Sequence, residues 1–374
     1  MNSKRKYSVL VIGPPHERMG GVADYLKMLI SNLNHEFESH YFCVGRKNPA
    51  NSFILVILGF VQDMIALFRA INKNSFDIVH LNPSFKINSF VRDSMYLFMI
   101  NMFHRTQKTM VFFHGWDRFL VEKICRSAFW TRIIRYIYKK ASTIVVLFHS
   151  CREQLSELGI DPAKIKVEST MYATFWNPKD REQLLKEKIN KKKTILFMSR
   201  FVREKGVFIA ADVAHLFVQN RHNEFRFIIA GGGPEFRNLK MYISETGLEE
   251  YIEIPGFVSG EAKKEILAKS DIFLFPSYFQ EGCPVVILEA MGAGLAIVST
   301  PAGAIPDIVK QNENGFIIDS RDPREFYEAI IKLIEDENLL RKIQKNNIEK
   351  AKENYEAKIA TRRIEALYLS TIKD

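Results

Sequence analysis

Short apolar segments alternate with longer amphipathic segments along the whole 374-residue chain. Such alternation is typical of strand–helix units, which build parallel sheets covered by helices. A hydrophobic content of 47% over this length is more than one ordinary core takes up. We therefore expect an α/β protein of two doubly wound domains.

The alternation places six expected strands in each half of the chain. In the first half they are Tyr7–Gly13, Phe37–Gly45, Phe76–Leu81, Thr109–His114, Ser142–Phe148 and Lys164–Glu168. In the second half they are Thr194–Arg200, Phe225–Gly231, Tyr251–Phe257, Asp271–Ser277, Ala296–Thr300 and Gly315–Asp319. Helical periodicity fills the segments between them.

A charged segment, Pro178 to Lys193, separates the two halves and is typical of an exposed linker. We expect one domain over residues 1–178, a second over residues 194–355, and a C-terminal helix over residues 356–374 that crosses the junction and packs back toward the first domain. Ligands of open α/β sheets bind at the carboxyl ends of strands. The expected site is therefore a cleft where the two domains face each other.

The net charge of +10 comes entirely from the N-terminal half. Residues 1–180 hold 24 Lys and Arg against 14 Asp and Glu, whereas residues 181–374 hold 29 of each kind. An anionic partner should therefore meet the first half of the chain.

The cysteines are scattered, with no pair at the spacing of a disulfide framework or a zinc site. They are Cys43, Cys125, Cys151 and Cys283. This favours a reducing, cytoplasmic setting. The apolar run Tyr7 to Ile12 is short and lacks a small-residue cleavage site, so we expect a strand there and no signal peptide.

The most apolar later segment is Phe53 to Ile71. Gln62, Asp63 and Arg69 interrupt it, and such side chains are costly at the centre of a bilayer. We therefore expect a buried or interfacial helix and no transmembrane span.

The densest candidate site is segment 277–289, which follows an expected strand and runs into a helix starting near Pro284. Proline at the first helical position leaves the next backbone amides, from Val285 on, pointing at an anion such as a phosphate. Beside an anion, the carboxylates of Glu281 and Glu289 make sense as acceptors for sugar hydroxyl groups. The alternative is that Glu281 only caps the helix and Glu289 faces solvent.

A second candidate is the segment from Arg200 to Gly206, which follows an expected strand and precedes an amphipathic helix. Arg200 can bind a diphosphate with two parallel hydrogen bonds, and Lys205 can act on it as a point charge. The alternative is a solvated surface pair.

Two glycine-containing turns follow expected strands. Gly20 and Gly21 would let backbone amides approach a phosphate or sugar, but the full dinucleotide spacing is absent, so we do not expect nicotinamide binding. Gly231 begins the second turn, which either approaches a nucleotide or packs closely.

His114 and Asp117 are polar residues at the end of an otherwise apolar strand, where they would face a ligand cleft. A lone histidine is as often structural. No Asp-x-Asp motif occurs, and no cluster of acidic residues and histidines has clear metal spacing. We therefore expect Arg200, Lys205 and helix termini to balance the charge of a leaving diphosphate.

Together these segments resemble the retaining glycosyltransferases of family 4, which have the GT-B fold of two Rossmann-like domains. The resemblance spans nearly the whole chain and is strongest from Thr194 to Asp319. The segments that carry it, in the order of the family, are Ser199–Gly206, Ala230–Glu235, Pro255–Val258, Phe275–Ser277 and Glu281–Gly292.

The resemblance implies a donor site for a nucleotide sugar such as a UDP- or GDP-sugar. Arg200 and Lys205 would hold the diphosphate, and Glu289 the ribose hydroxyls. Glu281 would bind the donor sugar together with the backbone of Gly282, Cys283, Pro284 and Val285.

The remaining implied roles fall on both halves. Phe257 would border the base, with Gly231 near the nucleotide. Gly20 and Gly21 would lie near the phosphates, and His114 by the transferred sugar.

The resemblance further implies the transfer of a hexose or N-acetylhexosamine to a glycan or lipid-linked acceptor, with neither cofactor nor metal, in cell-surface polysaccharide biosynthesis. The chain departs from the family at Glu168 to Thr174, where Pro-Asn-Gly-Val is common, so contacts of that loop are not carried over.

Segment 119–140 is both basic and aromatic, with six Lys and Arg interleaved with Phe129, Trp130, Tyr136 and Tyr138. Such a helix can rest on an anionic membrane surface. It can equally pack on the sheet with a solvated cationic face. With the first reading, the protein is cytoplasmic and lies at the inner face of the cytoplasmic membrane.

Two other readings compete. A sugar-nucleotide epimerase or a glycosyl phosphorylase uses a similar two-domain cleft, but we can place no cofactor lysine for a phosphorylase. A non-catalytic basic binding protein, for nucleic acid for example, leaves the paired glutamates unexplained, and no nucleic-acid motif occurs. We therefore expect no nucleic-acid partner.

Overall fold

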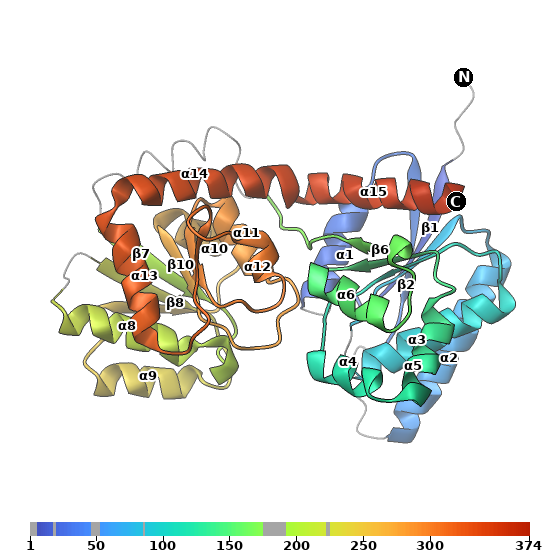
Figure 1. The fold of residues 1–374 in the computed structure, drawn as a ribbon, viewed down its shortest axis with the longest axis horizontal. Helices are drawn as coiled ribbons and strands as arrows, with labels where there is room; N and C mark the ends of the chain where they lie inside the picture. Colours follow the sequence, from blue (N-terminus) through green and yellow to red (C-terminus); the bar gives the residue numbers. More distant parts are fainter. Residues whose placement is uncertain (1–5, 18–19, 46–52, 85–86, 175–191, 222–224) are drawn as a thin grey trace. The chain divides into compact units, whose positions relative to one another are not determined.

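The computed structural model of the chain describes residues 6–17, 20–45, 53–84, 87–174, 192–221 and 225–374. It forms two compact units (Figure 1). Unit 1 comprises Met1–Met171 with Ala357–Asp374, and unit 2 comprises Tyr172–Glu356. Most of the expected linker, residues 178–191, lies outside the described residues.

Unit 1 contains a parallel six-stranded sheet in the order β2-β1-β3-β4-β5-β6. Its strands are β1 (Tyr7–Gly13), β2 (Phe37–Cys43), β3 (Ile78–Leu81), β4 (Thr109–Phe112), β5 (Thr143–Val146) and β6 (Ile165–Val167). Four of them, β1, β3, β4 and β5, are buried over most or all of their length, because helices cover both faces of a doubly wound sheet.

The helices of unit 1 come from both ends of the chain. They are α1 (Gly21–Asn32), α2 (Phe53–Lys73), α3 (Ile87–Phe103), α4 (Arg118–Cys125), α5 (Ala128–Tyr138), α6 (His149–Glu157), η1 (Pro162–Lys164) and α15 (Ala357–Lys373). Within unit 1, α2, α3, α4 and α5 gather on one side of the sheet (Figure 1).

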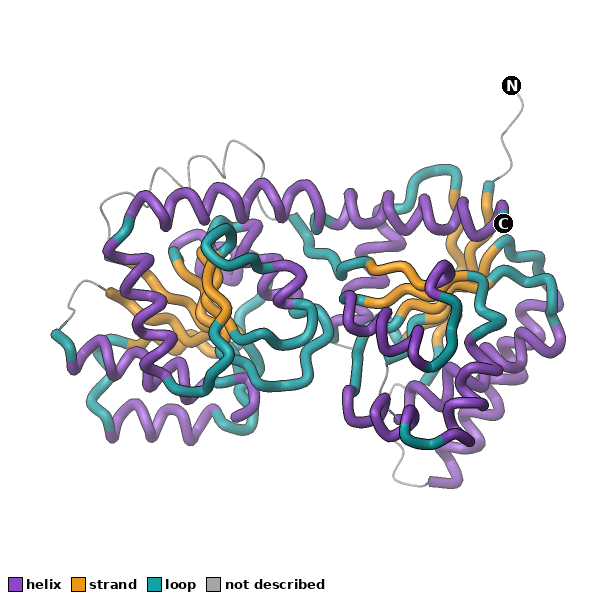
Figure 2. Tube along the Cα trace, in the orientation of Figure 1, coloured by secondary structure: helices purple, strands orange, loops and turns teal. Residues whose placement is uncertain are grey.

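Unit 2 contains a second parallel six-stranded sheet, in the order β12-β11-β10-β7-β8-β9. Its strands are β7 (Lys193–Met198), β8 (Phe225–Ala230), β9 (Ile252–Gly256), β10 (Ile272–Phe275), β11 (Ala296–Ser299) and β12 (Gly315–Ile317). Figure 2 shows how helices surround the strands of each sheet.

The helices of unit 2 complete its core. They are η2 (Arg203–Lys205), α8 (Val207–Gln219), α9 (Phe236–Glu245), α10 (Gly260–Lys269), α11 (Val285–Gly292), α12 (Ile305–Ile308), α13 (Pro323–Glu335) and α14 (Glu337–Asn354). Alternate residues of the central strands, such as Phe197 and Leu274, pack against Phe217 of α8 and Ile330 of α13. All twelve strands expected from the sequence are present, which confirms the α/β class with two doubly wound sheets.

Two successive helices end the chain, and the second, α15, covers nearly the same residues as the C-terminal helix expected over residues 356–374. Helix α14 ends at Asn354 in unit 2, and α15 begins at Ala357 and belongs to unit 1. In unit 1, Tyr368 of α15 is fully buried, and its hydroxyl lies 2.7 Å from Nδ1 of His80 on β3. Helix α15 therefore supplies part of the core of unit 1.

Of the two alternatives for segment 53–71, a buried helix is wrong for most of the described length, whereas an interfacial helix stays a prediction. Helix α2 buries Leu67 and Ile71, but it exposes five aliphatic residues in succession from Ile54 to Leu58. Among the described helices, Ile54–Lys73 alone is long and apolar enough to cross a membrane by length and composition.

The predicted single helix over residues 119–140 is also two helices, α4 and α5. Asp117 and Ser127 cap their first turns, because each side chain accepts a hydrogen bond from a backbone amide three residues on. Tyr138, expected on the basic face, is instead buried and bonds the hydroxyl of Ser94 at 2.8 Å.

Candidate active site

In unit 2 the candidate residues meet where the strand order reverses. Strands β7 and β10 are neighbours, but the chain continues from β7 toward β8 on one side and from β10 toward β11 on the other. The loops that leave their carboxyl ends diverge, and such a switch point is the usual ligand crevice of an open α/β sheet. Arg200 and Lys205 follow β7, and Glu281 follows β10.

Lys205 and Glu281 form a buried ion pair at this switch point. Lys205 Nζ lies 2.5 Å from Glu281 Oε1, and their side chains are 14% and 7% exposed. The hydroxyl of Ser277 donates to the same oxygen at 2.7 Å. No described residue hydrogen-bonds the second oxygen, Oε2, which can therefore accept a hydrogen bond from a ligand hydroxyl.

Lys205 is further held by aromatic rings. Its ammonium lies 4.8 Å from the ring centre of Phe279 and 5.6 Å from that of Phe275. The alternative of a solvated surface pair is therefore wrong for Lys205. Arg200, by contrast, is exposed, and its guanidinium makes no hydrogen bond or ion pair with any described residue, so it can bind an anion without losing a partner.

Helix α11 begins one residue later than the sequence predicted. Pro284 is the N-cap and Val285 is the first helical residue. No side chain caps this end, so the alternative of Glu281 as a capping residue is wrong. The first amides of a helix lack intrahelical acceptors, so those of Val285 and Val286 can bind an anion. Gly282 and Cys283 lead into this end and are partly exposed.

Glu289 lies within α11 and is 5% exposed, so the alternative that it faces solvent is wrong. Lys263 of α10 donates to its Oε1 at 2.6 Å. Lys263 was not among the predicted residues, because nothing in the sequence relates α10 to α11. This lysine balances the charge of the Glu289 carboxylate and fixes its orientation.

The Gly231 turn is shaped by close packing. Gly231 has φ +147°, and a Cβ there would lie 1.9 Å from the carbonyl oxygen of Ser199. Only glycine fits this position. Phe257, which directly follows β9, is 72% exposed.

In unit 1, His114 lies beside the corresponding switch point between β1 and β3. Asn82, which follows β3, donates from Nδ2 to the carbonyls of Ile12 and His80 at 3.0 and 3.3 Å. Its oxygen must then accept from His114 Nε2, which lies 2.9 Å away. His114 therefore carries its proton on Nε2 and has an unprotonated Nδ1.

The surroundings of His114 keep the imidazole neutral. Burial, followed by the effect of His80, lowers the pKa of His114 to about 3. Its ring centre lies 4.3 Å from that of Phe112 and 4.6 Å from that of Tyr25. Asn82 was missed at the sequence level, although it directly follows an expected strand and His114 ends the next one. Asp117 caps α4 and is not held in this network.

The turn at Gly20 and Gly21 opens α1. Gly20 has φ +151° and is the N-cap, with no side-chain cap. A Cβ at either glycine would meet nothing within 4 Å. The first amides of α1 are therefore accessible to a small anion. Residues 18 and 19 lie outside the described residues.

The atypical segment 168–174 has structural partners. Glu168 accepts from Arg363 Nε of α15 at 2.7 Å, within unit 1. Tyr172 is buried in unit 2, where its amide donates to the carbonyl of Tyr355 and its ring packs on Gly292 of α11. The segment is thus held by contacts within each unit, and Tyr172 is buried and not accessible to substrate.

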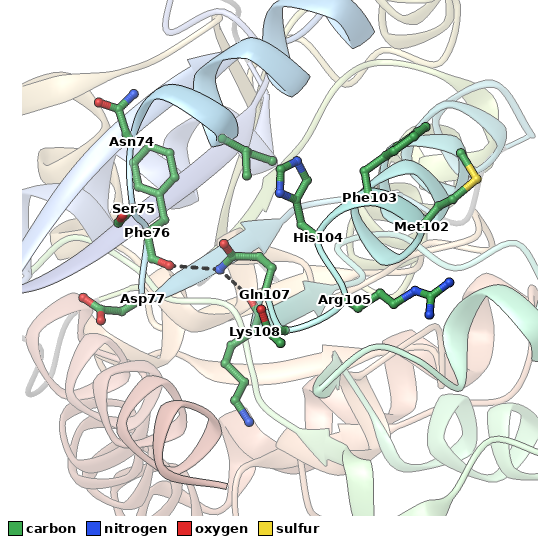
Figure 3. A pocket seen from close by; sticks show the side chains of 12 residues that line it. Asn74, Ser75, Phe76, Asp77, Met102, Phe103, His104, Arg105, Gln107 and Lys108 are labelled. Atoms are coloured by element: carbon green, nitrogen blue, oxygen red, sulfur yellow. Dashed lines mark hydrogen bonds between the residues drawn. The ribbon is translucent and has the colours of Figure 1, made fainter.

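A cavity of about 570 Å³ lies in unit 1 at the end of the sheet opposite to His114 (Figure 3). Its lining residues, such as Phe76, Asp77 and Lys108, directly precede β3 and β4. It therefore opens at the amino ends of the strands, away from His114. Across the described ranges, no group of three or more His, Cys, Asp and Glu side chains could hold a metal ion.

Comparison with known proteins finds glycosyltransferases. Residues 179–350 match the family model described as Glycosyl transferases group 1. The amylovoran biosynthesis glycosyltransferase AmsK of Erwinia amylovora is 27% identical over 188 residues, which cover 49% of this chain and 42% of AmsK. The chain spans less than half the length of the curated relatives that it matches first.

A longer match is the UDP-Gal:alpha-D-GlcNAc-diphosphoundecaprenol alpha-1,3-galactosyltransferase of Escherichia coli. It is 26% identical over 310 residues, covering 77% of this chain and 74% of that enzyme. Among solved structures, a glycosyltransferase from Rickettsia africae ESF-5 superposes with a TM-score of 0.75 at 19% identity, over 99% of this chain and 100% of that one. The predicted GT-B architecture of two Rossmann-like domains is thereby confirmed.

Proposed function

We propose that this chain is a retaining glycosyltransferase that moves a hexose or N-acetylhexosamine from a nucleoside diphosphate sugar to a glycan or lipid-linked acceptor. The observation that carries the proposal is the Lys205–Glu281 pair at the switch point of unit 2, beside the exposed Arg200. It lies within the segment that matches the group 1 family model. The two cations can bind the diphosphate of a sugar donor, and the adjacent Glu281 carboxylate can accept a hydrogen bond from a hydroxyl of its sugar.

Each group has a defined task in the proposed reaction. Arg200, Lys205 and the first amides of α11 stabilise the negative charge that grows on the diphosphate, and stabilisation of this kind usually contributes most to the rate enhancement by an enzyme. Glu281 Oε2 accepts a hydrogen bond from a hydroxyl of the donor sugar, and Glu289 accepts hydrogen bonds from the ribose hydroxyls. Phe257 offers an exposed ring to the base.

The proposed transfer needs no reactant other than the sugar donor and the acceptor. The bond from the anomeric carbon to the diphosphate oxygen breaks, and its electron pair leaves with that oxygen. The acceptor hydroxyl oxygen attacks the same face of the sugar, and its proton passes to the departing phosphate oxygen. Because fixed cations balance the diphosphate, the proposed reaction is metal-independent and needs no cofactor.

The resemblance assigns two further roles, to unit 1. His114 is proposed to contact the transferred sugar, where its unprotonated Nδ1 can accept a hydrogen bond from a sugar hydroxyl. The Gly20 and Gly21 turn is proposed to lie near phosphate, since the amides opening α1 suit an anion.

The first donor and acceptor to test come from the relatives. The Escherichia coli enzyme is named for UDP-galactose and for a diphosphoundecaprenol-linked acceptor, and AmsK for amylovoran biosynthesis. We propose a role in cell-surface polysaccharide biosynthesis, on the cytoplasmic side and at the inner face of the cytoplasmic membrane.

The test begins with calorimetric titration of the full chain with UDP, GDP and ADP in the presence of EDTA. We expect one nucleotide to bind without metal. The matching sugar donors are then incubated with and without lipid-linked acceptors, and we expect nucleotide release only with acceptor and retained anomeric configuration by NMR. Epimerised sugar nucleotide without acceptor would favour the epimerase reading, and no nucleotide binding would favour a non-catalytic binding protein.

A further inference from the structure

The N-terminal end of α2 exposes apolar side chains on all sides. The five residues from Ile54 to Leu58 are 46–67% exposed, and Val61 and Ile65 are also exposed. Five successive residues take up more than one full turn, so they point in every direction around the helix axis. A helix that covers a soluble domain normally exposes polar residues on its outer side.

The neighbouring helix α3 continues this surface. Five of its exposed apolar residues fall three to four positions apart on one stripe: Ile87, Val91, Met95, Phe98 and Met102. Phe103, the last residue of α3, is also exposed. Helices α2 and α3 run side by side in the same direction. Phe60 stacks on Tyr96 at 5.5 Å, and further along both helices Phe68 packs on Phe103 at 5.3 Å.

Helices α4 and α5 add aromatic residues to the same side of unit 1. Phe119, Phe129, Trp130 and Tyr136 are 48–74% exposed. The ring of Tyr136 lies 6.4 Å from that of Phe98, which joins α5 to the stripe of α3 (Figure 1). We call the exposed apolar residues of α2, α3, α4 and α5 the apolar face.

Positive charge accompanies the apolar face. Residues 53–140 hold thirteen Lys and Arg against five Asp and Glu, a net +8 of the chain's +10. The helices that carry the exposed aromatic rings, α4 and α5, and the adjoining turns also carry exposed cations, among them Lys123, Arg126, Arg132, Lys139 and Lys140. The ammonium groups of Lys139 and Lys140 lie 5.4 and 4.9 Å from the ring centre of Tyr136.

This combination favours a bilayer over a protein partner. A protein surface can cover one side of a helix, whereas acyl chains can surround the whole protruding end of α2. Aromatic rings beside lysines and arginines suit the headgroup region, and a net positive face suits anionic lipids. Removing apolar surface of this extent from water is strongly favourable.

The packing of α2 also excludes a transmembrane span in this fold. Leu67 and Ile71, in its second half, are buried in the core of unit 1, and Asp63 Oδ2 accepts from the amide of Gly45 at 3.1 Å. A spanning α2 would have to leave these contacts. Only its first turns are therefore available to lipid.

We infer that the apolar face seats unit 1 on an anionic bilayer, with the first turns of α2 among the acyl chains and the cations of α4 and α5 at the lipid phosphates. The inference deepens the proposed function, since it names the surface at which a membrane-borne acceptor is met. Membrane binding is tested without sugar transfer, so the membrane inference and the proposed function can fail separately.

The test is co-sedimentation of the full chain with vesicles of mixed phosphatidylcholine and phosphatidylglycerol, against pure phosphatidylcholine. We expect binding to the mixed vesicles, weakened about tenfold or more by Leu55→Glu with Leu58→Glu. Lys139→Glu with Lys140→Glu should remove the preference for anionic lipid. Met241→Glu, at an exposed apolar residue of unit 2, is the matched control and should bind as the wild type does.

Circular dichroism and thermal unfolding of each variant show that it is folded. The inference is overturned if the wild-type protein stays in the supernatant with both kinds of vesicle, or if the folded α2 variant binds as well as the wild type. Concentration-dependent dimerisation that the α2 variant abolishes, without vesicle binding, would assign the apolar face to a second copy instead.

Discussion

Lys205 and Glu281 are 76 residues apart in the chain, yet their side chains form a 2.5 Å ion pair because β7 and β10 are adjacent in the sheet. Ser277 Oγ donates to the same carboxylate. The pair stands at the switch point, so a substitution there acts on the fold of unit 2 as well as on the proposed chemistry. Unfolding and transfer rates measured on the same variants separate the two effects.

Lys205→Ala should destabilise unit 2 by about 3–5 kcal/mol, because it leaves the buried Glu281 carboxylate without its cation. It should also lower the transfer rate by about 10²–10³-fold, as expected for a lost charge-stabilising group. The double variant Lys205→Met with Glu281→Gln should regain stability but not activity. Urea unfolding and initial rates measure both; a double variant that transfers at the wild-type rate would contradict the proposed roles.

Arg200→Ala should leave stability within about 0.5 kcal/mol of the wild type, because the Arg200 guanidinium has no partner among the described residues. The transfer rate should nevertheless fall about 10²–10³-fold. Arg203→Ala is the matched control, since Arg203 lies in the same loop but pairs with Glu235 at 3.3 Å. Equal rates for the two variants would remove Arg200 from the proposed site.

Glu289→Gln should weaken nucleotide binding by about tenfold to a hundredfold, the range for losing a hydrogen bond to a charged acceptor. Calorimetric titration with the nucleotide that the wild type binds measures the change. Glu253→Gln, at an exposed carboxylate of the same unit that pairs with Arg226, should not change the affinity. Undiminished binding by Glu289→Gln would rule out its ribose role.

Gly231→Ala should destabilise unit 2 by at least about 3 kcal/mol, because its Cβ would meet the Ser199 carbonyl at 1.9 Å in a strained conformation. Gly247→Ala is the comparison. Gly247 also has a positive φ, +66°, but a Cβ there meets nothing within 4 Å, so the cost should be only about 1–2 kcal/mol. Similar unfolding midpoints for both variants would show that the close contact is relieved.

Unit 1 should lose stability as the pH falls from about 6.5 toward 3. Burial lowers the pKa of His80 to about 3, so in this window the unfolded chain binds a proton that the folded chain does not. Each such histidine contributes a slope of up to about 1.4 kcal/mol per pH unit. In urea unfolding at a series of pH values, His80→Gln should have a slope smaller by nearly that amount; an unchanged slope would contradict the lowered pKa.

The strands were predictable because both faces of each parallel sheet are buried, which leaves short apolar runs in the sequence. Their carboxyl ends were predicted too long. Strand β4 ends at Phe112 and β7 at Met198, whereas the predictions ran to His114 and Arg200. Backbone hydrogen bonds to the neighbouring strand continue for one residue past each strand, at Phe113 and Ser199, so the sequence alone does not mark where the strand stops.

The single residues of the candidate site were predictable from their place after strands, but their pairings were not. Asn82 orients His114, and Lys263 pairs with Glu289, through contacts that depend on strand order and on how neighbouring helices lie. The sequence left α2 as either buried or interfacial for a related reason. Composition shows that the helix is apolar, and only the position of its neighbours shows that the side chains from Ile54 to Leu58 stay exposed.

The return of the chain to unit 1 has a consequence for biosynthesis. Tyr368 on α15 fills the core beside His80, but the ribosome delivers α15 only after every residue of unit 2. Unit 1 therefore emerges first with an open groove over β3, while unit 2, whose segments are contiguous, can reach its final packing earlier. The half of the molecule made first is thus the half completed last.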